Sequence, residues 1–340
     1  MKVLFIGLGG IGQRHLRLLK NIIPNAAISA VRHSTQVSEI TDTLQLNSDV
    51  DIEQKYNIKI YHSIDEAMIA KPDFAIVANP TSMHVETAIK LVGNKIPVLL
   101  EKPISNSDSR VDDLVALSLK NNTPVMIAFM MRFHPCAIQL EKYITDQVLG
   151  NIYNVSINVN SYMPSWHKYE SYNSFYAGRN DLGGGVILTE IHEIDLLNSF
   201  FGMPEKLYAI GGKRSALDLD VEDSVSVLMG YKHNNSEFAV TLNMSFVQRA
   251  PIREFYIFGE HGSILWNISD SSIVLNDYTN GFTDTHTFDE FQRNDMFRDQ
   301  MVHFIDSVES KTTPLTDISN VIGGHKIALN IKKAIADNNS

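Results

Sequence analysis

The chain of 340 residues contains a single cysteine, Cys136. One cysteine cannot form an internal disulfide or a multi-cysteine metal site, and we expect no metal site in this protein. A lone cysteine also fits a reducing compartment, so the sequence predicts a cytoplasmic protein. Cys136 itself is expected to be a packed core thiol rather than a nucleophile.

Positive charge and long apolar runs are also scarce. Lys and Arg number 29 against 39 Asp and Glu, which gives a net charge of −10. Because nucleic-acid phosphates require clustered Lys and Arg, the charge balance excludes nucleic acid as the main partner. The apolar runs are too short to cross a bilayer or to act as a signal peptide, so we expect no membrane partner.

The first 128 residues alternate short apolar runs with segments long enough for helices. This alternation is typical of a parallel βαβ series whose strands are buried on both faces. The expected strands are residues 3–6, 28–31, 74–78, 98–100 and 125–129, and the expected helices are 13–20, 64–70, 82–92 and 107–121. The sequence thus predicts an α/β fold that begins with a doubly wound domain over residues 1–128, with ligands at the carboxyl ends of its strands.

The pattern changes beyond residue 130, and residues 129–340 are expected to form an α+β domain. After a helix at 135–148, period-two segments predict a large, mainly antiparallel open sheet, with Asn234-Asn235 as a hairpin turn. Its strands are expected at 152–162, 206–212, 225–231, 238–246, 254–258 and 263–268, and helices at 296–310 and 318–336. Gly323-Gly324 would weaken or break the last helix, which could pack back on the first domain. One sheet face carries small, weakly polar side chains, which suggests contact with another subunit.

An apolar run at the N-terminus leads directly into glycines at positions 7, 9 and 12. In a strand-turn-helix context, Gly7 permits the tight turn, Gly9 lets the backbone approach a diphosphate, and Gly12 lets the helix pack closely on the strand. The following helix supplies free N–H groups and a positive dipole for phosphate. The turn therefore predicts a dinucleotide site.

The residue after the second expected strand indicates which dinucleotide binds. An acidic side chain usually accepts hydrogen bonds from the ribose of NAD at this place, but the chain has Arg32, followed by Ser34. A guanidinium suits a 2′-phosphate better than a diol. We therefore favour NADP over NAD, although Arg32 could instead be a solvated residue while a later group meets the ribose.

Two further places carry groups suited to hydride-transfer chemistry. Lys102 follows the strand that ends at residue 100, where it could stabilise negative charge on a substrate oxygen. Glu190, His192 and Asp195 follow three consecutive glycines at the start of an expected helix. His192 and Asp195 are three residues apart and can share one helix face.

Residues 162–181 are rich in aromatic rings and hydrogen-bonding groups. Aromatic faces and polar tips suit carbohydrate recognition, for which Trp166, His167 and Arg179 are the first candidates. Arg179 would suit a carboxylate or a phosphate. A loop that packs its own aromatic rings explains this composition equally well.

Five motifs in this order resemble the glucose–fructose oxidoreductase, inositol dehydrogenase and rhizopine catabolism (Gfo/Idh/MocA) family. They are the glycine turn at 7–12, Ala-Asn-Pro-Thr-Ser-Met-His at 78–84, Glu-Lys-Pro at 101–103, Arg-Phe-His-Pro at 132–135 and Gly-Gly-Gly…His-x-x-Asp at 183–195. The resemblance covers nearly the whole chain. It implies a Rossmann domain, a second domain built on a large open sheet, and homodimers or homotetramers packed through that sheet.

The resemblance also implies a reaction, namely NAD(P)-dependent oxidation or reduction of a sugar, cyclitol or related hydroxyl. His192 would act as general acid or base on the reacting oxygen and Lys102 would polarise it, with Glu190 and Asp195 nearby. Coenzyme contacts are expected from the family motifs, that is from Gly7, Gly9, Gly10, Ile11, Gly12, Asn79, Pro80, His84, Glu101, Lys102 and Arg132.

One position departs from the family pattern. Many members carry an aspartate four residues before the histidine, where this chain has Leu188. A leucine neither orients an imidazole nor exchanges protons, so either Asp195 or Glu190 replaces the aspartate or the substrate itself supplies the missing contact. The departure keeps two alternatives open: an NADP-binding sensor with impaired catalysis, and glycosidase-like chemistry that uses bound NAD.

Overall fold

The computed structural model describes residues 1–32, 38–41, 43–167, 169–233 and 236–339, which form two compact units. Unit 1 contains Met1–Phe129, His167–Ser171 and Phe297–Asn320, and unit 2 contains Met130–Trp166, Tyr172–Met296 and Val321–Ser340. Ser34 and the predicted turn at Asn234-Asn235 lie outside the described residues. No helix in the described part of the chain is both long and apolar enough to cross a membrane.

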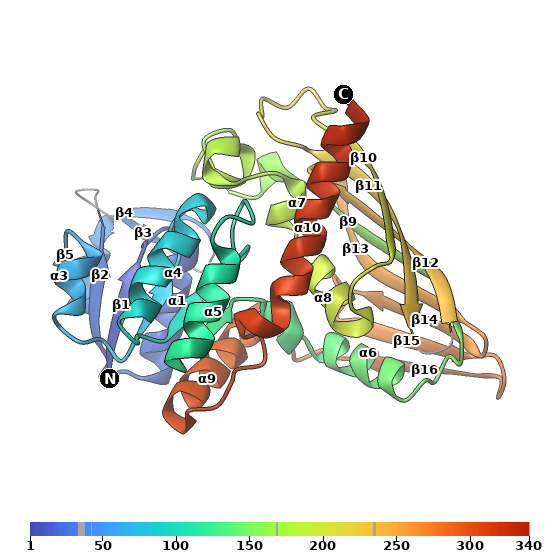
Figure 1. Ribbon diagram of the computed structural model, residues 1–340, viewed down its shortest axis with the longest axis horizontal. Coiled ribbons are helices and arrows are strands. Elements are labelled where there is room, and N and C mark those ends of the chain that lie inside the picture. Colours follow the sequence, from blue (N-terminus) through green and yellow to red (C-terminus); the bar gives the residue numbers. More distant parts are fainter. Residues whose placement is uncertain (33–37, 42, 168, 234–235, 340) are drawn as a thin grey trace. The chain divides into compact units, whose positions relative to one another are not determined.

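Unit 1 is built on a six-stranded parallel sheet with strand order β5-β2-β1-β6-β7-β8 (Figure 1). The strands are β1 (Lys2–Ile6), β2 (Ala27–Val31), β5 (Lys59–Tyr61), β6 (Phe74–Val77), β7 (Val98–Leu100) and β8 (Val125–Ile127). The same unit contains the helices α1 (Gly10–Ile22), α3 (Ile64–Met68), α4 (His84–Gly93), α5 (Val111–Asn121) and α9 (Arg293–Ser310), except for the first residues of α9. The strand order reverses between β1 and β6, which confirms the predicted doubly wound fold.

Several elements of unit 1 differ from the sequence prediction. A hairpin of β3 (Ser38–Ile40) and β4 (Leu46–Asp51), helix α2 (Ile52–Tyr56) and the edge strand β5 were not expected, because these segments are short and largely polar. The helix expected from residue 107 starts only at Val111, since Arg110 adopts a left-handed conformation with φ of 58°. The helix expected from residue 82 is a 3₁₀ turn at Thr81–Met83 followed by α4.

Unit 2 is built on an eight-stranded sheet with strand order β10-β11-β12-β9-β13-β14-β15-β16. The strands are β9 (Ile152–Tyr162), β10 (Lys206–Gly212), β11 (Ser224–His233), β12 (Ser236–Ser245), β13 (Val247–Gly259), β14 (Gly262–Asn267), β15 (Ser272–Asp277) and β16 (Phe282–Thr287). Among these strand pairs only β9 and β12 run parallel, so the predicted mainly antiparallel sheet is confirmed. The last two strands were not expected.

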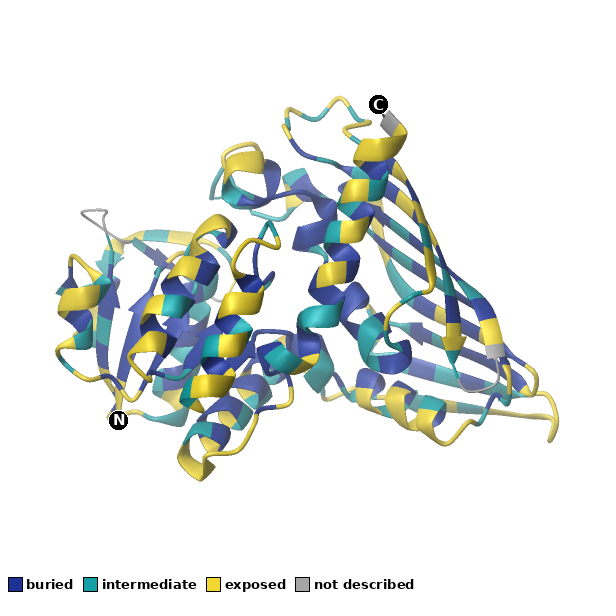
Figure 2. Ribbon diagram, in the orientation of Figure 1, coloured by how far each residue is buried: buried dark blue, intermediate teal, exposed yellow. Residues whose placement is uncertain are grey.

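Helices cover one face of this sheet (Figures 1 and 2). They are α6 (Pro135–Thr145), α7 (Val186–Thr189), α8 (His192–Phe201) and α10 (Ile318–Asn339). Gly323 and Gly324 lie within α10 and do not break it. A Cβ at Gly324 would lie 3.1 Å from the Cα of Asp195, so the small residue lets α10 pack directly on the backbone of α8.

The other face of the sheet carries rows of aligned side chains. The strand register places Tyr208, Leu228, Thr241, Ser156 and Tyr256 in one row. The neighbouring row forms a hydrogen-bonded ladder: the Ser226 hydroxyl donates to Asn243, Asn243 to Asn158, and Asn158 to Glu254. This face is therefore polar along one row and partly apolar along the next.

Candidate functional site: a dinucleotide pocket and a buried histidine helix

The glycine turn connects β1 to α1 and lies against the end of β6. Gly7 has φ of 97°, and a Cβ there would lie 2.5 Å from the carbonyl oxygen of Ala78. A Cβ at Gly12 would collide with the carbonyl oxygen of Gly7, whereas a Cβ at Gly9 would meet no described atom within 4 Å. Gly7 and Gly12 are thus required by the fold itself, while Gly9 leaves open space at the start of α1.

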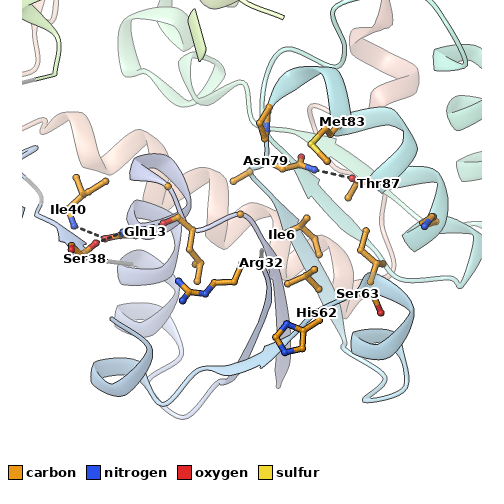
Figure 3. A pocket seen from close by; sticks show the side chains of 18 of the residues that line it. Ile6, Gln13, Arg32, Ser38, Ile40, His62, Ser63, Asn79, Met83 and Thr87 are labelled. Atoms are coloured by element: carbon orange, nitrogen blue, oxygen red, sulfur yellow. Dashed lines mark hydrogen bonds between the residues drawn. The ribbon is translucent and has the colours of Figure 1, made fainter. Parts of the chain in front are cut away.

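A pocket of about 770 Å³ opens beside this turn (Figure 3). It lies at the carboxyl ends of β1, β2 and β6, as expected for ligands of a doubly wound sheet. Its lining includes Gly7, Gly9, Gln13, Arg32, Ser38, Ile40, His62, Ser63, Asn79, Pro80 and Met83. Of the coenzyme residues expected from the sequence, Gly7, Gly9, Arg32, Asn79 and Pro80 line this pocket.

One wall of the pocket is anchored by Gln13, which the sequence analysis did not single out. Its side-chain amide donates to the carbonyl oxygens of Leu8, at 3.1 Å, and Ser38, at 3.0 Å, and its oxygen accepts the N–H of Ile40, at 2.7 Å. These bonds fasten β3 to the glycine turn. Gln13 was recognisable in the sequence as a polar residue on the face of α1 that is buried.

Two polar side chains present unsatisfied atoms at the pocket. Arg32 contacts Glu53 of α2 through Nη2, at 2.6 Å from Oε1, while its Nη1 is buried without a hydrogen-bond partner among the described residues. Asn79 donates from Nδ2 to the hydroxyl of Thr87 at 3.0 Å, and its Oδ1 is likewise buried without a described partner. Buried polar atoms without partners are costly, so both atoms point to a polar ligand.

The segment around Lys102 is tied to α1 and to the loop after β6. The backbone N–H of Lys102 donates to Glu101 at 3.1 Å, and the other carboxylate oxygen of Glu101 lies 2.7 Å from Nε2 of His15. Burial opposes ionisation of Glu101, but His15 and Lys102 keep its pKa below the ordinary value. His84 lies between the carbonyl oxygens of Pro103 and Asn79, at 2.8 and 2.9 Å. His84 therefore holds the loops after β6 and β7 together, and Glu101 ties the loop after β7 to α1.

In unit 2, His192 is the first residue of α8 and is buried. Asp195 lies one turn further along, where the guanidinium of Arg132 holds its carboxylate from Nε, at 2.6 Å, and from Nη2, at 3.1 Å. Arg132 also donates to the hydroxyl of Ser199. The structure thus joins Arg132, expected at the coenzyme, to Asp195, expected to be catalytic. Burial raises the pKa of Asp195 against the opposing charge of Arg132.

A second arginine holds the carboxylates on either side of His192. Arg253 of β13 binds Glu193 through two hydrogen bonds of 2.6 and 2.8 Å, and its Nη1 lies 3.4 Å from Glu190. Burial disfavours the charge on Arg253, but the two carboxylates outweigh burial and raise its pKa. Arg253 and Glu193 were not predicted, because nothing in the sequence relates them across 60 positions.

Leu188 and the glycines before it are packed tightly. Leu188 is fully buried in α7. Gly185 precedes α7 with φ of 104°, and a Cβ there would collide with the carboxylate of Glu222. Glu222 also accepts the N–H of Val186 through its backbone oxygen. Gly185 is needed because Glu222 occupies the space beside it, and Gly184 because the carbonyl oxygens of Tyr176 and Ala177 do.

The aromatic segment contributes three residues that already contact their own chain. Trp166 packs edge-on against Phe246, His167 lies 2.9 Å from Glu170, and Arg179 makes two bonds to Asp181. Residues His167–Ser171 belong to unit 1, where the Tyr169 hydroxyl is 2.9 Å from the place of a Cβ on Gly10. This segment therefore lies against the first residue of α1.

Two family models match the chain. One, described as an oxidoreductase family with an NAD-binding Rossmann fold, matches residues 1–129, and the other, the GFO/IDH/MocA C-terminal domain, matches residues 138–265. The chain belongs to the Gfo/Idh/MocA family. The resemblance found in the sequence motifs is thereby confirmed.

Individual Gfo/Idh/MocA relatives are distant in sequence. The D-xylose 1-dehydrogenase (NADP(+)) 2 of Haloferax volcanii is 23% identical over 92% of this chain and 90% of that protein. The putative oxidoreductase YteT of Bacillus subtilis is 27% identical over 44% of this chain, which spans only 35% of that protein. The WlbA dehydrogenase of Bordetella pertussis, solved with NADH and UDP-GlcNAcA, is 18% identical with a TM-score of 0.78 over 99% of this chain and 96% of that one. This last likeness shows the common fold.

Proposed function

We propose that this chain is an NAD(P)-dependent oxidoreductase that transfers a hydride between nicotinamide and a hydroxyl or carbonyl group of a sugar, cyclitol, sugar acid or nucleotide sugar. The pocket at the glycine turn is the observation that carries this proposal. Its residues fit a dinucleotide, because Gly9 leaves space for phosphate beside the first turn of α1, and the lining residues Arg32 and Asn79 each carry a buried polar atom without a partner among the described residues.

When bound, the nicotinamide coenzyme would supply the hydride acceptor or donor. In the proposed reaction His192 takes the proton from the reacting hydroxyl or returns it. The role proposed for Lys102, from the Glu-Lys-Pro motif, is to donate a hydrogen bond from its ammonium group to a substrate oxygen. Asp195 and Glu190, the candidates to replace the missing aspartate, have their carboxylates held by Arg132 and Arg253. Trp166, His167 and Arg179 remain the candidate substrate residues.

A coenzyme-reduction screen over polyols, sugars, sugar acids and nucleotide sugars tests the proposal. We expect net reduction of coenzyme with at least one compound, and a loss of turnover of about a hundredfold or more in Lys102→Ala and His192→Ala. Turnover that persists in folded His192→Ala would show that the histidine has no acid–base role.

A sensor or regulator that binds NADP is the second candidate, and the fully buried Leu188 favours it. An apolar residue replaces the aspartate that would complete the catalytic set. This candidate predicts coenzyme binding without net reduction for any compound in the screen. Glycosidase-like chemistry would instead release sugar products without net reduction.

We further propose that NADP is preferred over NAD. Arg32 supports this preference because it lines the pocket and carries a donor with no described partner. Titration of both coenzymes by isothermal calorimetry tests it, and tighter binding of NAD would refute it.

We also propose a homodimer or homotetramer that forms through the open face of the unit 2 sheet. Tyr208, Ile210 and Leu228 are exposed there, with exposed fractions of 63%, 71% and 47%. Light scattering after gel filtration should give a dimer or a tetramer, and Tyr208→Glu combined with Ile210→Glu should shift the mass toward a monomer. The lone cysteine further supports a cytoplasmic location, which cell fractionation would test.

A further inference from the structure

Arg32 is paired inside the protein before any ligand arrives. It follows β2, and only 9% of its side chain is exposed. The Nη2 atom lies 2.6 Å from Oε1 of Glu53, so the two opposite charges compensate each other. Arg32 lines the pocket, and Glu53 stands behind it on α2.

Glu53 is held in this place by its own helix. The carboxylate of Asp51 caps α2 and accepts the N–H of Glu53 at 2.8 Å, and the carbonyl oxygen of Glu53 accepts the N–H of Ile58. The next carboxylate nearby, Glu39, is bound to Lys55 at 2.5 Å. Among the residues that the structure describes, Glu53 is therefore the carboxylate paired with Arg32.

The pair affects phosphate and hydroxyl ligands differently. The 2′-phosphate of NADP carries about two negative charges, so it is attracted by Arg32 and repelled by Glu53, whose carboxylate lies 2.6 Å from the Arg32 guanidinium. The 2′-hydroxyl of NAD is neutral, so the charge on Glu53 does not repel it. Glu53 consequently weakens the binding of NADP more than that of NAD.

We propose that Glu53 sets the coenzyme discrimination of this chain by neutralising Arg32 and opposing a 2′-phosphate. The inference rests on the proposed function, since it concerns the same dinucleotide pocket. Arg32 gives the chain its preference for NADP, and Glu53 limits that preference so that NAD is also accepted.

The test measures the equilibrium binding of NADP and NAD by calorimetry, at low and at high salt, for the full chain and three single variants. Glu53→Gln should raise the ratio of NADP to NAD affinity about tenfold at low salt and less at high salt, because screening weakens the interaction between charges. Glu39→Gln is the matched control, because it removes a neighbouring carboxylate that pairs with Lys55 and not with Arg32. Its affinity ratio should stay within about twofold of the parent value.

Arg32→Ala should lower NADP binding, and adding Glu53→Gln to it should raise the ratio of NADP to NAD affinity again, because Glu53 repels the 2′-phosphate whether or not Arg32 is present. Circular dichroism confirms that each variant is folded. If Glu53→Gln does not fold, Glu53→Asp replaces it, because aspartate withdraws the carboxylate from Arg32 without removing the charge. An unchanged ratio in a folded Glu53 variant overturns this inference and leaves the proposed function standing. Failure of the parent chain to bind either coenzyme overturns both.

Discussion

The three glycines of the turn serve different purposes at the scale of single residues. Gly7 and Gly12 are in contact with backbone atoms, whereas a Cβ on Gly9 would meet no described atom within 4 Å and Gly9 has an ordinary φ of −71°. Only Gly9 is thus free for substitution as far as the fold is concerned. The space beside it is where the diphosphate is proposed to bind.

Gly9→Ala should leave the melting temperature within about 2 °C of the parent and weaken coenzyme binding about tenfold or more, because the methyl group occupies ligand space. Thermal unfolding and calorimetry measure the two effects. Gly7→Ala is the contrasting variant and should lose about 2 kcal/mol or more of stability, through its positive φ and its contact with Ala78. Unchanged coenzyme affinity in Gly9→Ala would place the diphosphate elsewhere.

The residues that can be predicted from the sequence are those whose role depends on near neighbours in the chain. The glycine turn is of this kind, since the strand, the turn and the helix follow one another directly. Gln13, Glu53 and Arg253 act on groups brought to them by the fold, and Arg253 binds a carboxylate 60 positions away. No local pattern reveals such partners.

At the scale of elements, helix α6 depends on an unusual N-cap. The ring nitrogen Nδ1 of His134 accepts the N–H of Cys136 at 3.1 Å, and the ring packs against Trp266 and Phe291. Burial, aided by the charge of Arg253, lowers the pKa of His134 to about 4. The cap therefore works only while the imidazole is neutral.

This cap predicts a loss of stability in mild acid. The unfolded chain takes up a proton near pH 6.5 and the folded chain only near 4, so the stability contributed by neutral His134 is complete above pH 6.5 and declines as the pH falls toward 4. The loss should reach about 3 kcal/mol. Urea unfolding at a series of pH values measures it.

His134→Asn is the matched control for this prediction, because asparagine can cap the helix but does not titrate. The difference in unfolding free energy between the parent and this variant should shrink or reverse between pH 6.5 and 4. A difference independent of pH would show that His134 is not the titrating group. Other buried histidines, such as His84, remain in both proteins, so their effect on stability cancels in the difference.

Elements with strong periodicity were predictable, and the short polar elements at the sheet margins were not. The central strands of unit 1 consist of apolar runs, and the long strands of unit 2 alternate apolar with polar residues. Both patterns identify strands from the sequence alone. The hairpin of β3 and β4 and the strand β16 are short and polar, because they lie at the margins and bury little. The parallel pairing of β9 with β12 depends on the whole sheet, which period-two alternation does not specify.

At the scale of the whole molecule, unit 1 is completed by residues from far along the chain. The N–H of Ile127 in β8 donates to the carbonyl oxygen of Thr316, whose hydroxyl donates back to Ile127 across 189 positions. Asp317 accepts the N–H of Val125 at 3.3 Å and also that of Ser319 at 3.0 Å. The sequence offers no sign that this late segment borders β8.

Asp317→Ala should loosen the β8 edge and destabilise unit 1 by about 2 kcal/mol, because a buried N–H loses its acceptor and α10 loses a polar group at its start. Hydrogen exchange followed by mass spectrometry should show faster exchange over β8. Exchange in β1 serves as the internal reference, and Asp317→Asn should behave closer to the parent. Equal acceleration in both strands would indicate global unfolding instead of a local opening.

The bonds between β8 and Thr316 also have a consequence for synthesis on the ribosome. At about 5–20 residues per second, the 189 positions between the partners take roughly 10–40 seconds to translate. During that interval β8 is an uncovered strand edge, the kind of surface on which nascent chains associate wrongly. A chaperone that shelters β8 until residue 316 emerges would therefore raise the yield of folded protein, and slow codons placed after residue 127 would lower it.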